Sequence, residues 1–282
     1  GIDSALSAEL CVRALGRDKL LGLILPERES NPISAEYAAK HARKMGIATE
    51  TLDITRTLDA LGVYDKRDNA IRGVFPDYDG SWKSKIVLPA DLLSRDSFNI
   101  FTLKVEDGAG HSRSARLKNE SLRSIVAATN VKQRTRMVCL YSVAERENYL
   151  VCGTTNRSEA VQGFFVKYGD GGVDIEPLQH LYKTQVYQLA EYLGVIKEVI
   201  DRAPSPDTYS SVVTDVEFYF RMPYDTLDLL LYAWENSVPV EEVRMAMGLS
   251  EEQVRRAFRD FASKFNATRH LRTFPPTLDM RT

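Results

Sequence analysis

The chain has 282 residues, of which 44% are hydrophobic, 9% aromatic and 27% charged. This composition excludes a disordered, collagen-like or disulfide-scaffold chain, and the length suffices for one large domain with a buried core. With 37 Lys and Arg against 39 Asp and Glu, the formal net charge is -2, which gives no electrostatic reason to expect nucleic acid or an anionic membrane as a partner.

The first part of the chain alternates between predicted helices and short strands. Residues 3–15 carry the apolar stripe of a helix, and residues 20–25 form an apolar run that is typical of a buried parallel strand and too short to cross a membrane. A second helix, with Ser34 as its N-cap, is expected to end at Gly46. A second strand is predicted at 48–54.

Residues 62–129 break this alternation. They contain several glycines and two short β-like runs, at 85–88 and 99–105, so we predict a β-rich insertion. The sequence assigns no site to this insertion, and it could cover a nucleotide, extend a dimer contact or dock an ammonia donor.

The alternation resumes with a long amphipathic helix at 130–147, an apolar strand at 149–154 and a helix at 184–193. Strands that alternate with helices predict a parallel sheet of the Rossmann-like α/β class, in which ligands bind at the carboxyl ends of the strands. We therefore divide the chain into an α/β domain at 1–223, which includes the insertion, and a C-terminal helical segment at 224–282.

Cysteines and histidines show no metal-ligand spacing. The three cysteines lie in apolar stretches without a CxxC pair and are interpreted as buried free thiols in a reducing compartment, which predicts a cytoplasmic protein. The four histidines are scattered and are interpreted as ordinary surface or core residues. The cysteines are Cys11, Cys139 and Cys152, and the histidines are His41, His111, His180 and His270.

Two short segments suit nucleotide chemistry. Gly1-Ile2-Asp3-Ser4 runs directly into a helix, where backbone N–H groups and the helix dipole favour a phosphate, Asp3 can bind Mg²⁺ and Ser4 can bind a phosphate oxygen. GTTNRSE at 153–159 follows a strand and supplies neutral hydrogen-bonding groups and the carboxylate of Glu159. In both cases a simple helix cap is the alternative.

Three further features add to this pattern. KYGDGGVD at 167–174 combines three glycines with two acids, which favours a close approach of backbone to a ligand over a plain turn. NVKQRTR at 130–136 places cations at a predicted helix start, where they oppose the dipole and suggest an anionic ligand or else a solvated basic face. Lys183 can reach a phosphate from the start of its helix, or it is a surface lysine.

In this order, the segments resemble the ammonia-using NAD synthetases, a family of ATP pyrophosphatases with an SGGxDS loop. Gly1-Ile2-Asp3-Ser4 matches the last four positions of that loop. NVKQRTRM at 130–137 and GTTNRSEAVQGFFVKYGDGGVDIEPLQHLYKTQV at 153–186 match the family's most specific stretches. The resemblance covers nearly the whole chain except 62–129, and it implies an adenine-nucleotide-hydrolase-like fold.

The resemblance implies that deamido-NAD, ATP and ammonia are converted to NAD, AMP and pyrophosphate. ATP adenylates the nicotinate carboxylate, and ammonia then attacks the acyl-adenylate; since a carboxylate is a poor acyl donor, AMP serves as the leaving group. The resemblance also implies Mg²⁺ and a homodimer with the dinucleotide site at its interface. The cysteines lack the context of a glutaminase nucleophile, so free ammonia is expected unless a separate glutaminase supplies it.

Functional residues follow from the resemblance position by position. Asp3, Lys183 and Asp170 are implied to be catalytic, and Asp3 and Glu159 are implied to bind Mg²⁺. The residues implied to bind ATP are Gly1, Asp3, Ser4, Arg136, Thr154, Lys183 and Ser205. Those implied to bind deamido-NAD are Asn130, Arg134, Asp170, His270 and Arg272.

Two motifs of the sequence depart from the family pattern. His270-Leu271-Arg272 replaces the usual His-Lys pair, and VTDVE at 213–217 replaces a Gln-Thr-Asp-Glu motif. Two alternatives stay open: a related pyrophosphatase that amidates another carboxylate, and a DNA-binding protein. For the latter, residues 240–258 resemble a helix-turn-helix with Gly248 at the turn and a basic second helix, although a plain helical hairpin fits as well.

Overall fold

The computed structural model describes residues 1–89, 91–94 and 99–277. Helices and strands alternate in the first part, in the order α1 (Ile2–Leu15), a 3-10 turn (Arg17–Lys19), β1 (Leu21–Ile24), α2 (Pro32–Met45) and β2 (Ala48–Thr51). β1 and β2 pair in parallel, with Leu21 opposite Ala48. The predicted elements of this region are confirmed, although β2 ends before the expected residue 54.

The start of α2 differs from the prediction. Asn31, not Ser34, is the N-cap: its Oδ1 accepts the Ile33 N–H at 3.1 Å, and Pro32 occupies the first helical position. Ser34 Oγ instead donates to Asp207 Oδ2 at 2.9 Å, so it joins α2 to a distant loop.

The middle of the chain forms a second, antiparallel sheet. Its order is β3-β4-β5, and it follows two short helices. The β-rich character predicted for 62–129 is confirmed at its centre, but the segment begins with a helix and ends inside another. The elements are α3 (Thr55–Ala60), α4 (Val63–Arg72), β3 (Lys83–Val87), β4 (Thr102–Glu106), β5 (Ser112–Arg116) and α5 (Asn119–Glu147).

The long helix α5 begins at Asn119 rather than at the predicted residue 130. Its extra turns pack Leu122, Ile125 and Val126 into the core of the antiparallel sheet, so the buried face of the helix begins before residue 130. The cations at 130–136 therefore lie inside the helix, and the argument that they oppose a helix dipole was wrong.

The predicted strand at 149–154 is reduced to one parallel bridge between Cys152 and Ile175. The Asp174 N–H donates to Val151 O at 2.9 Å, while Asp174 Oδ2 accepts the Val151 N–H at 2.8 Å. This bond to the Asp174 side chain occupies the Val151 N–H, which a longer strand would need for pairing with its neighbour. In the described residues, regular parallel pairing is thus confined to β1 and β2.

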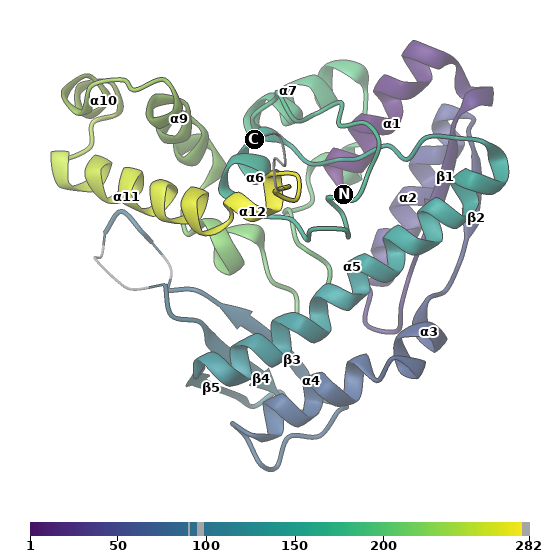
Figure 1. The fold of residues 1–282 in the computed structure, drawn as a ribbon, viewed down its shortest axis with the longest axis horizontal. Helices are drawn as coiled ribbons and strands as arrows, with labels where there is room; N and C mark the ends of the chain where they lie inside the picture. The colour runs from purple at the N-terminus through teal and green to yellow at the C-terminus, as the bar shows by residue number, and fades with distance from the viewer. Residues whose placement is uncertain (90, 95–98, 278–282) are drawn as a thin grey trace, which may run out of the picture.

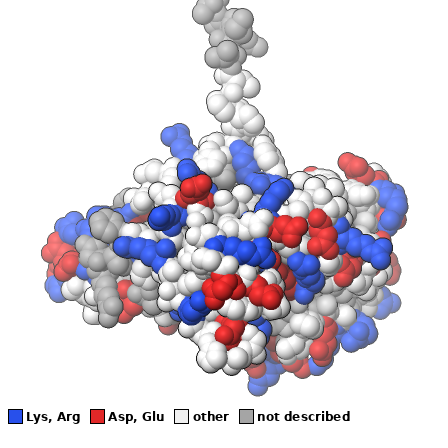
Figure 2. All heavy atoms as spheres, turned by 90° about the horizontal axis from the view of Figure 1, so that it is seen from below, with Lys and Arg blue, Asp and Glu red and all other residues white. Residues whose placement is uncertain are grey.

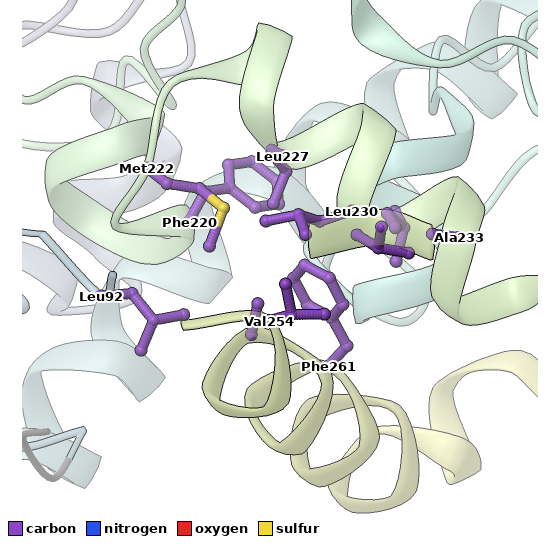
Figure 3. Packing of buried hydrophobic residues seen from close by; sticks show 11 residues of the cluster. Leu92, Phe220, Met222, Leu227, Leu230, Ala233, Val254 and Phe261 are labelled. Atoms are coloured by element: carbon purple, nitrogen blue, oxygen red, sulfur yellow. The ribbon is translucent and has the colours of Figure 1, made fainter. Parts of the chain in front are cut away.

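The rest of the chain is mainly helical, as predicted from residue 224 onward. Leu227, Leu230, Val254 and Phe261 form the centre of its core together with Phe220, as Figure 3 shows. The helices are α6 (Arg157–Gln162), α7 (Lys183–Leu193), α8 (Lys197–Ile200), a π-helical turn (Val216–Phe220), α9 (Tyr224–Glu235), α10 (Val240–Met247), α11 (Glu251–Ala267) and α12 (Arg269–Arg272).

The helix-turn-helix interpretation does not fit this packing. α10 and α11 form a hairpin that packs on α9, and Val254 lies in the core. Arg256, expected on a basic recognition face, is buried and donates to the backbone oxygen of Leu93 at 2.7 Å. A plain helical hairpin is therefore the correct description.

Figure 1 shows how these parts are arranged: α5 extends from the β1–β2 pair toward the antiparallel sheet, α9, α10 and α11 gather at one side of the molecule, and α12 lies beside α6. On the face seen in Figure 2, Lys and Arg are interspersed with Asp and Glu. Within the described ranges, no helix is long and apolar enough to cross a membrane.

Candidate active site

Side chains from three helices meet at the ammonium group of Lys183, the first residue of α7. Its Nζ lies 2.5 Å from Asp3 Oδ2, in the first turn of α1, and 3.6 Å from Glu159 Oε1, in the first turn of α6. The Lys183 side chain is only 1% exposed, so this is a buried ion cluster. The structure thus brings together the two predicted metal ligands and a predicted catalytic residue.

Asn156 connects the two carboxylates. Its Nδ2 donates to Asp3 Oδ1 at 3.0 Å, and its Oδ1 accepts the Glu159 N–H at 3.1 Å. The Asn156 N–H in turn donates to Glu159 Oε2 at 3.2 Å, which completes a capping box. Asn156 was not assigned a role from the sequence, although an Asn three residues before a Glu is the signature of this cap.

Asp228 of α9 holds the starts of α6 and α7. Its Oδ1 accepts the Ser158 hydroxyl at 2.6 Å, and its Oδ2 accepts the Thr184 N–H at 2.7 Å. Ser158 Oγ also accepts the N–H of Lys183 at 3.1 Å. Asp228 is buried and places Lys183, but nothing in the sequence distinguishes it from other acids of an amphipathic helix.

Asp215 is a third carboxylate near the cluster. Its Oδ2 accepts the Tyr224 hydroxyl at 3.0 Å, and the Tyr224 ring lies 5.5 Å from Lys183 Nζ. Among the described residues, the buried Oδ1 has no hydrogen-bond partner. Burial raises the pKa of Asp215 to about 6, against the opposing effect of Lys183. The sequence marked Asp215 only as part of the VTDVE departure.

The cluster holds more negative groups than one ammonium can neutralise. Burial alone would lower the pKa of Lys183, but the charges of Asp3, Glu159 and Asp215 outweigh it and raise that pKa. Burial raises the pKa of Glu159 well above its usual range, and Asp3 and Asp215 add to this despite Lys183. An added cation would therefore be stabilised here.

The donor set fits a magnesium ion. Asp3 and Glu159 supply carboxylate oxygens, and Mg²⁺ is commonly bound by one or two carboxylates together with substrate phosphates and water. In the part of the chain that the structure describes, no group of three or more His, Cys, Asp and Glu side chains has metal-binding geometry. Asp3 and Glu159 would be the carboxylate ligands that the chain contributes to such a site.

Arg136 lies at the carboxyl end of β1, where a parallel sheet binds its ligands. Its Nε donates to Leu25 O at 3.1 Å and its Nη2 to Ser30 Oγ at 3.4 Å. Burial lowers the pKa of Arg136, and the nearby charges of Glu27 and Asp170 oppose this shift. The assignment of Arg136 to the ATP side stays a prediction.

Lys132, one turn earlier on α5, forms a second buried ion cluster. Its Nζ donates to Glu27 Oε1 at 2.9 Å, Glu29 Oε2 at 2.7 Å and Thr208 O at 3.0 Å. Tyr64 donates to the other oxygen of Glu27 at 2.6 Å. Lys132 was seen in the sequence only as part of a basic segment, because its partners lie far away along the chain.

The glycine-rich segment forms a tight turn beside α5. Asp170 Oδ1 accepts the Val166 N–H at 2.9 Å, which closes the turn on itself. A Cβ atom on Gly171 would lie 2.5 Å from the Phe165 ring, so a larger residue does not fit there. The close approach of this backbone to a ligand stays a prediction.

The predicted dinucleotide contacts lie around this turn. Arg134 Nε donates to Lys167 O at 3.3 Å, and Lys167 Nζ donates to His270 O at 2.7 Å, which docks α12. Arg272 binds the backbone oxygen of Ala160 at 3.4 Å, so its guanidinium already has protein partners. The other predicted site residues are exposed or half-buried, namely Gly1, Ser4, Asn130, Thr154 and Ser205.

Comparison with known proteins decides the family. The model of the family described as NAD synthase matches residues 1–73 and 92–275. The chain belongs to the NAD synthase family. It is 44% identical over 275 residues to the NH3-dependent NAD+ synthetase of Mesorhizobium japonicum, covering 98% of this chain and 86% of that protein. It is 46% identical to the corresponding Rhizobium meliloti protein, covering 98% and 82%.

Solved structures confirm the α/β fold of this NAD synthase family member. NMN synthetase from Francisella tularensis is similar at a TM-score of 0.65 and 23% identity, covering 99% of this chain and 86% of that chain. NH3-dependent NAD synthetase from Campylobacter jejuni, in complex with nitrate, is similar at a TM-score of 0.61 and 22% identity, with the same coverage. The predicted Rossmann-like class is therefore correct.

Residues 74–91 lie outside the match to the family model, and they include β3. β3 contacts the loop that follows Ser205: Ser84 O accepts the Ser211 N–H at 3.1 Å, and Lys85 Nζ donates to Val212 O at 2.9 Å. Of the predicted insertion at 62–129, only 74–91 thus lies outside the family match, and its strand β3 supports the loop that carries Asp215.

Proposed function

We propose that this NAD synthase family member amidates deamido-NAD to NAD, with ATP and ammonia as co-substrates and AMP and pyrophosphate as the other products. The observation that carries this proposal is the meeting of Asp3 and Glu159 at the buried ammonium of Lys183, directly beside the start of α1. The same cluster offers a cation, carboxylates and a helix N-terminus to a polyphosphate.

ATP binds with its phosphates at the start of α1. Gly1 and Ser4 face the phosphate oxygens, and Ser205 and Thr154 contribute neutral hydrogen bonds. Lys183 neutralises charge that develops as the bond between the α- and β-phosphates breaks. Asp3 and Glu159 would hold Mg²⁺, and a bound Mg²⁺ would add to this neutralisation as a Lewis acid. Arg136, at the end of β1, lines the ATP side.

Deamido-NAD binds on the side of α5 and the glycine-rich turn. Asn130, Arg134, Asp170, His270 and Arg272 orient it so that a nicotinate carboxylate oxygen faces the α-phosphorus of ATP. The attack forms the acyl-adenylate and releases pyrophosphate. Ammonia then attacks the acyl carbon, and AMP leaves. Positioning of two bound substrates supplies much of the rate, because it replaces an encounter in solution.

The dinucleotide site lies at the interface of a homodimer. Support comes from apolar side chains that α5 and the segment after it leave in solvent: Val138 is 61% exposed and Leu150 is 70% exposed. Apolar surface of this kind is favourable to bury between subunits. Sedimentation of the reduced protein should give twice the monomer mass, and Val138→Glu should shift it toward the monomer.

The test is turnover by the purified chain with deamido-NAD, ATP and Mg²⁺, with either ammonium or glutamine as the nitrogen source. We expect NAD, AMP and pyrophosphate in equal amounts with ammonium, and little NAD with glutamine unless a glutaminase is added. AMP release that requires a different carboxylic acid, without NAD formation, would contradict the proposed acceptor.

A further inference from the structure

Two cysteines meet where α1 contacts the segment that leads into α6. The Sγ atoms of Cys11, on α1, and Cys152, at the parallel bridge, lie 3.7 Å apart in hydrogen-bond contact, although 141 positions separate them in sequence. Cys11 is buried and Cys152 is half-buried, so the pair lies at the edge of the core. Cys139 packs elsewhere, against the cluster between α3, α4 and α5.

The geometry of this pair suits a disulfide. A disulfide bond is about 2.05 Å long, so bond formation requires the two sulfurs to approach by about 1.7 Å, which draws α1 and the Cys152 segment toward each other. The contact also favours reaction, because the hydrogen bond with Cys152 lowers the pKa of Cys11 to about 7, against the opposing effect of burial.

We propose that Cys11 and Cys152 form a redox-sensitive pair, which a peroxide converts to an intramolecular disulfide that slows the enzyme. With hydrogen peroxide, one thiolate attacks an oxygen, the O–O bond breaks, and the sulfur becomes a sulfenic acid while hydroxide takes up a proton to form water. The second thiol attacks the sulfenic sulfur, the S–O bond breaks, and its proton leaves with the hydroxyl as water. The two sulfurs lose two electrons, and the peroxide gains them.

The crosslink would act on the site through the two elements that it joins. α1 carries Asp3, and the segment around Cys152 leads to Asn156, which donates to Asp3 Oδ1. Ser7 Oγ donates to Gly153 O at 3.3 Å, between the cysteines and the site. Drawing Cys11 and Cys152 together shifts these elements relative to each other, and a misplacement of about 1 Å can cost about 10²-fold in rate.

The test treats the reduced full-length protein with hydrogen peroxide, then counts free thiols after denaturation, maps crosslinked peptides and measures NAD formation. The proposal goes beyond the proposed function and uses that reaction only as one readout. We expect the three thiols of the chain to fall to one, a Cys11–Cys152 crosslink, and a loss of kcat of about tenfold or more that dithiothreitol reverses.

Matched variants separate this pair from general oxidation. Cys139→Ser should behave like the wild type, whereas Cys152→Ser and Cys11→Ala should each keep the reduced activity and lose the crosslink and the peroxide sensitivity. Three free thiols after peroxide, equal inactivation of Cys152→Ser, or a crosslink without loss of rate would each overturn the proposal. Absence of NAD formation by the reduced wild type would instead overturn the proposed function, and the thiol count would still report on the pair.

Discussion

At the scale of single residues, the site depends on the charge balance around Lys183. One buried ammonium faces Asp3, Glu159 and Asp215, and burial holds the pKa of Glu159 high in the absence of another cation. Removing a charged partner from such a cluster leaves the remaining buried charge less well compensated, and it also removes an oxygen that could bind a metal. The carboxylates can therefore be tested one at a time.

Asp3→Asn and Glu159→Gln should each lower kcat by about 10²- to 10³-fold, because each removes an anionic oxygen that holds the metal beside the phosphates. The Mg²⁺ concentration for half-maximal activity should rise in both. Asp18→Asn, at a side chain that is 93% exposed, is the control and should be neutral. Near-normal turnover at low Mg²⁺ in either site variant would refute the metal assignment.

Gly153 is a residue whose missing side chain leaves room for another group. A Cβ atom there would lie 2.5 Å from the carboxyl of Glu176. Gly153→Ala should therefore lower the free energy of unfolding by about 1–3 kcal/mol through overpacking. Gly108→Ala, where a Cβ meets no atom within 4 Å, should change it by less than about 0.5 kcal/mol. Urea denaturation measures both, and equal effects would contradict the steric explanation.

Titration of Glu176 should make the free energy of unfolding depend on pH, with a sign that follows from its pKa shift. Burial raises its pKa to about 7, although the Thr155 N–H, which donates to Oε2 at 3.1 Å, partly opposes the shift. The folded chain thus holds this proton more tightly than the unfolded chain, where a Glu has a pKa of about 4.3. Protonation therefore stabilises the folded chain fully below a pH of about 4.3, and this stabilisation is lost as the pH rises toward about 7.

Glu176→Gln should remove this dependence, because the amide oxygen can still accept the Thr155 N–H and carries no charge. Between pH 5 and pH 8, the wild type should lose free energy of unfolding relative to the variant. Denaturant titrations of both proteins at several pH values measure the difference. A constant difference over this range would show that the carboxyl does not titrate there.

At the scale of elements, α9 fixes the starts of α6 and α7 through Asp228, which we describe as a positioning residue. Asp228→Ala leaves the buried Ser158 hydroxyl and the Thr184 N–H without their acceptor, at about 1–3 kcal/mol for each unpaired group. Because Lys183 begins α7, kcat should also fall. Asp225→Ala, on the exposed side of α9, is the matched control. An unchanged kcat in a folded Asp228→Ala protein would show that Lys183 does not depend on this contact.

Sequence signals within a few residues predicted most helices and strands. The prediction was wrong where contacts between residues distant in sequence decide the structure. The prediction found β1 from its apolar run and the ends of α2 and α7 from the glycines that follow them. These signals lie within a few residues of the element that they mark. The start of α5 was missed because Leu122 and Ile125 are helical through packing on a sheet that the sequence pattern does not reveal. The strand at 149–154 was overestimated because Asp174 takes a ladder donor through its side chain.

At the scale of the whole molecule, the predicted site residues were found through the family resemblance, and the structure adds their supports. Asp3, Glu159 and Lys183 were predicted and meet as expected. Asn156, Asp228, Asp215 and Lys132 were not assigned, because each acts through partners distant in sequence. A motif identifies groups that touch substrates, whereas the residues that place them become visible only after folding.

In the proposed reaction, the nicotinate carboxylate attacks the α-phosphorus of ATP next to Asp3, Glu159 and Lys183. Deamido-NAD labelled with ¹⁸O in that carboxylate tests this event directly, with mass spectrometry of the nucleotide products after turnover with ammonium and Mg²⁺. The account predicts that each AMP carries one ¹⁸O atom from the carboxylate. Unlabelled AMP, or ADP together with labelled inorganic phosphate, would contradict it.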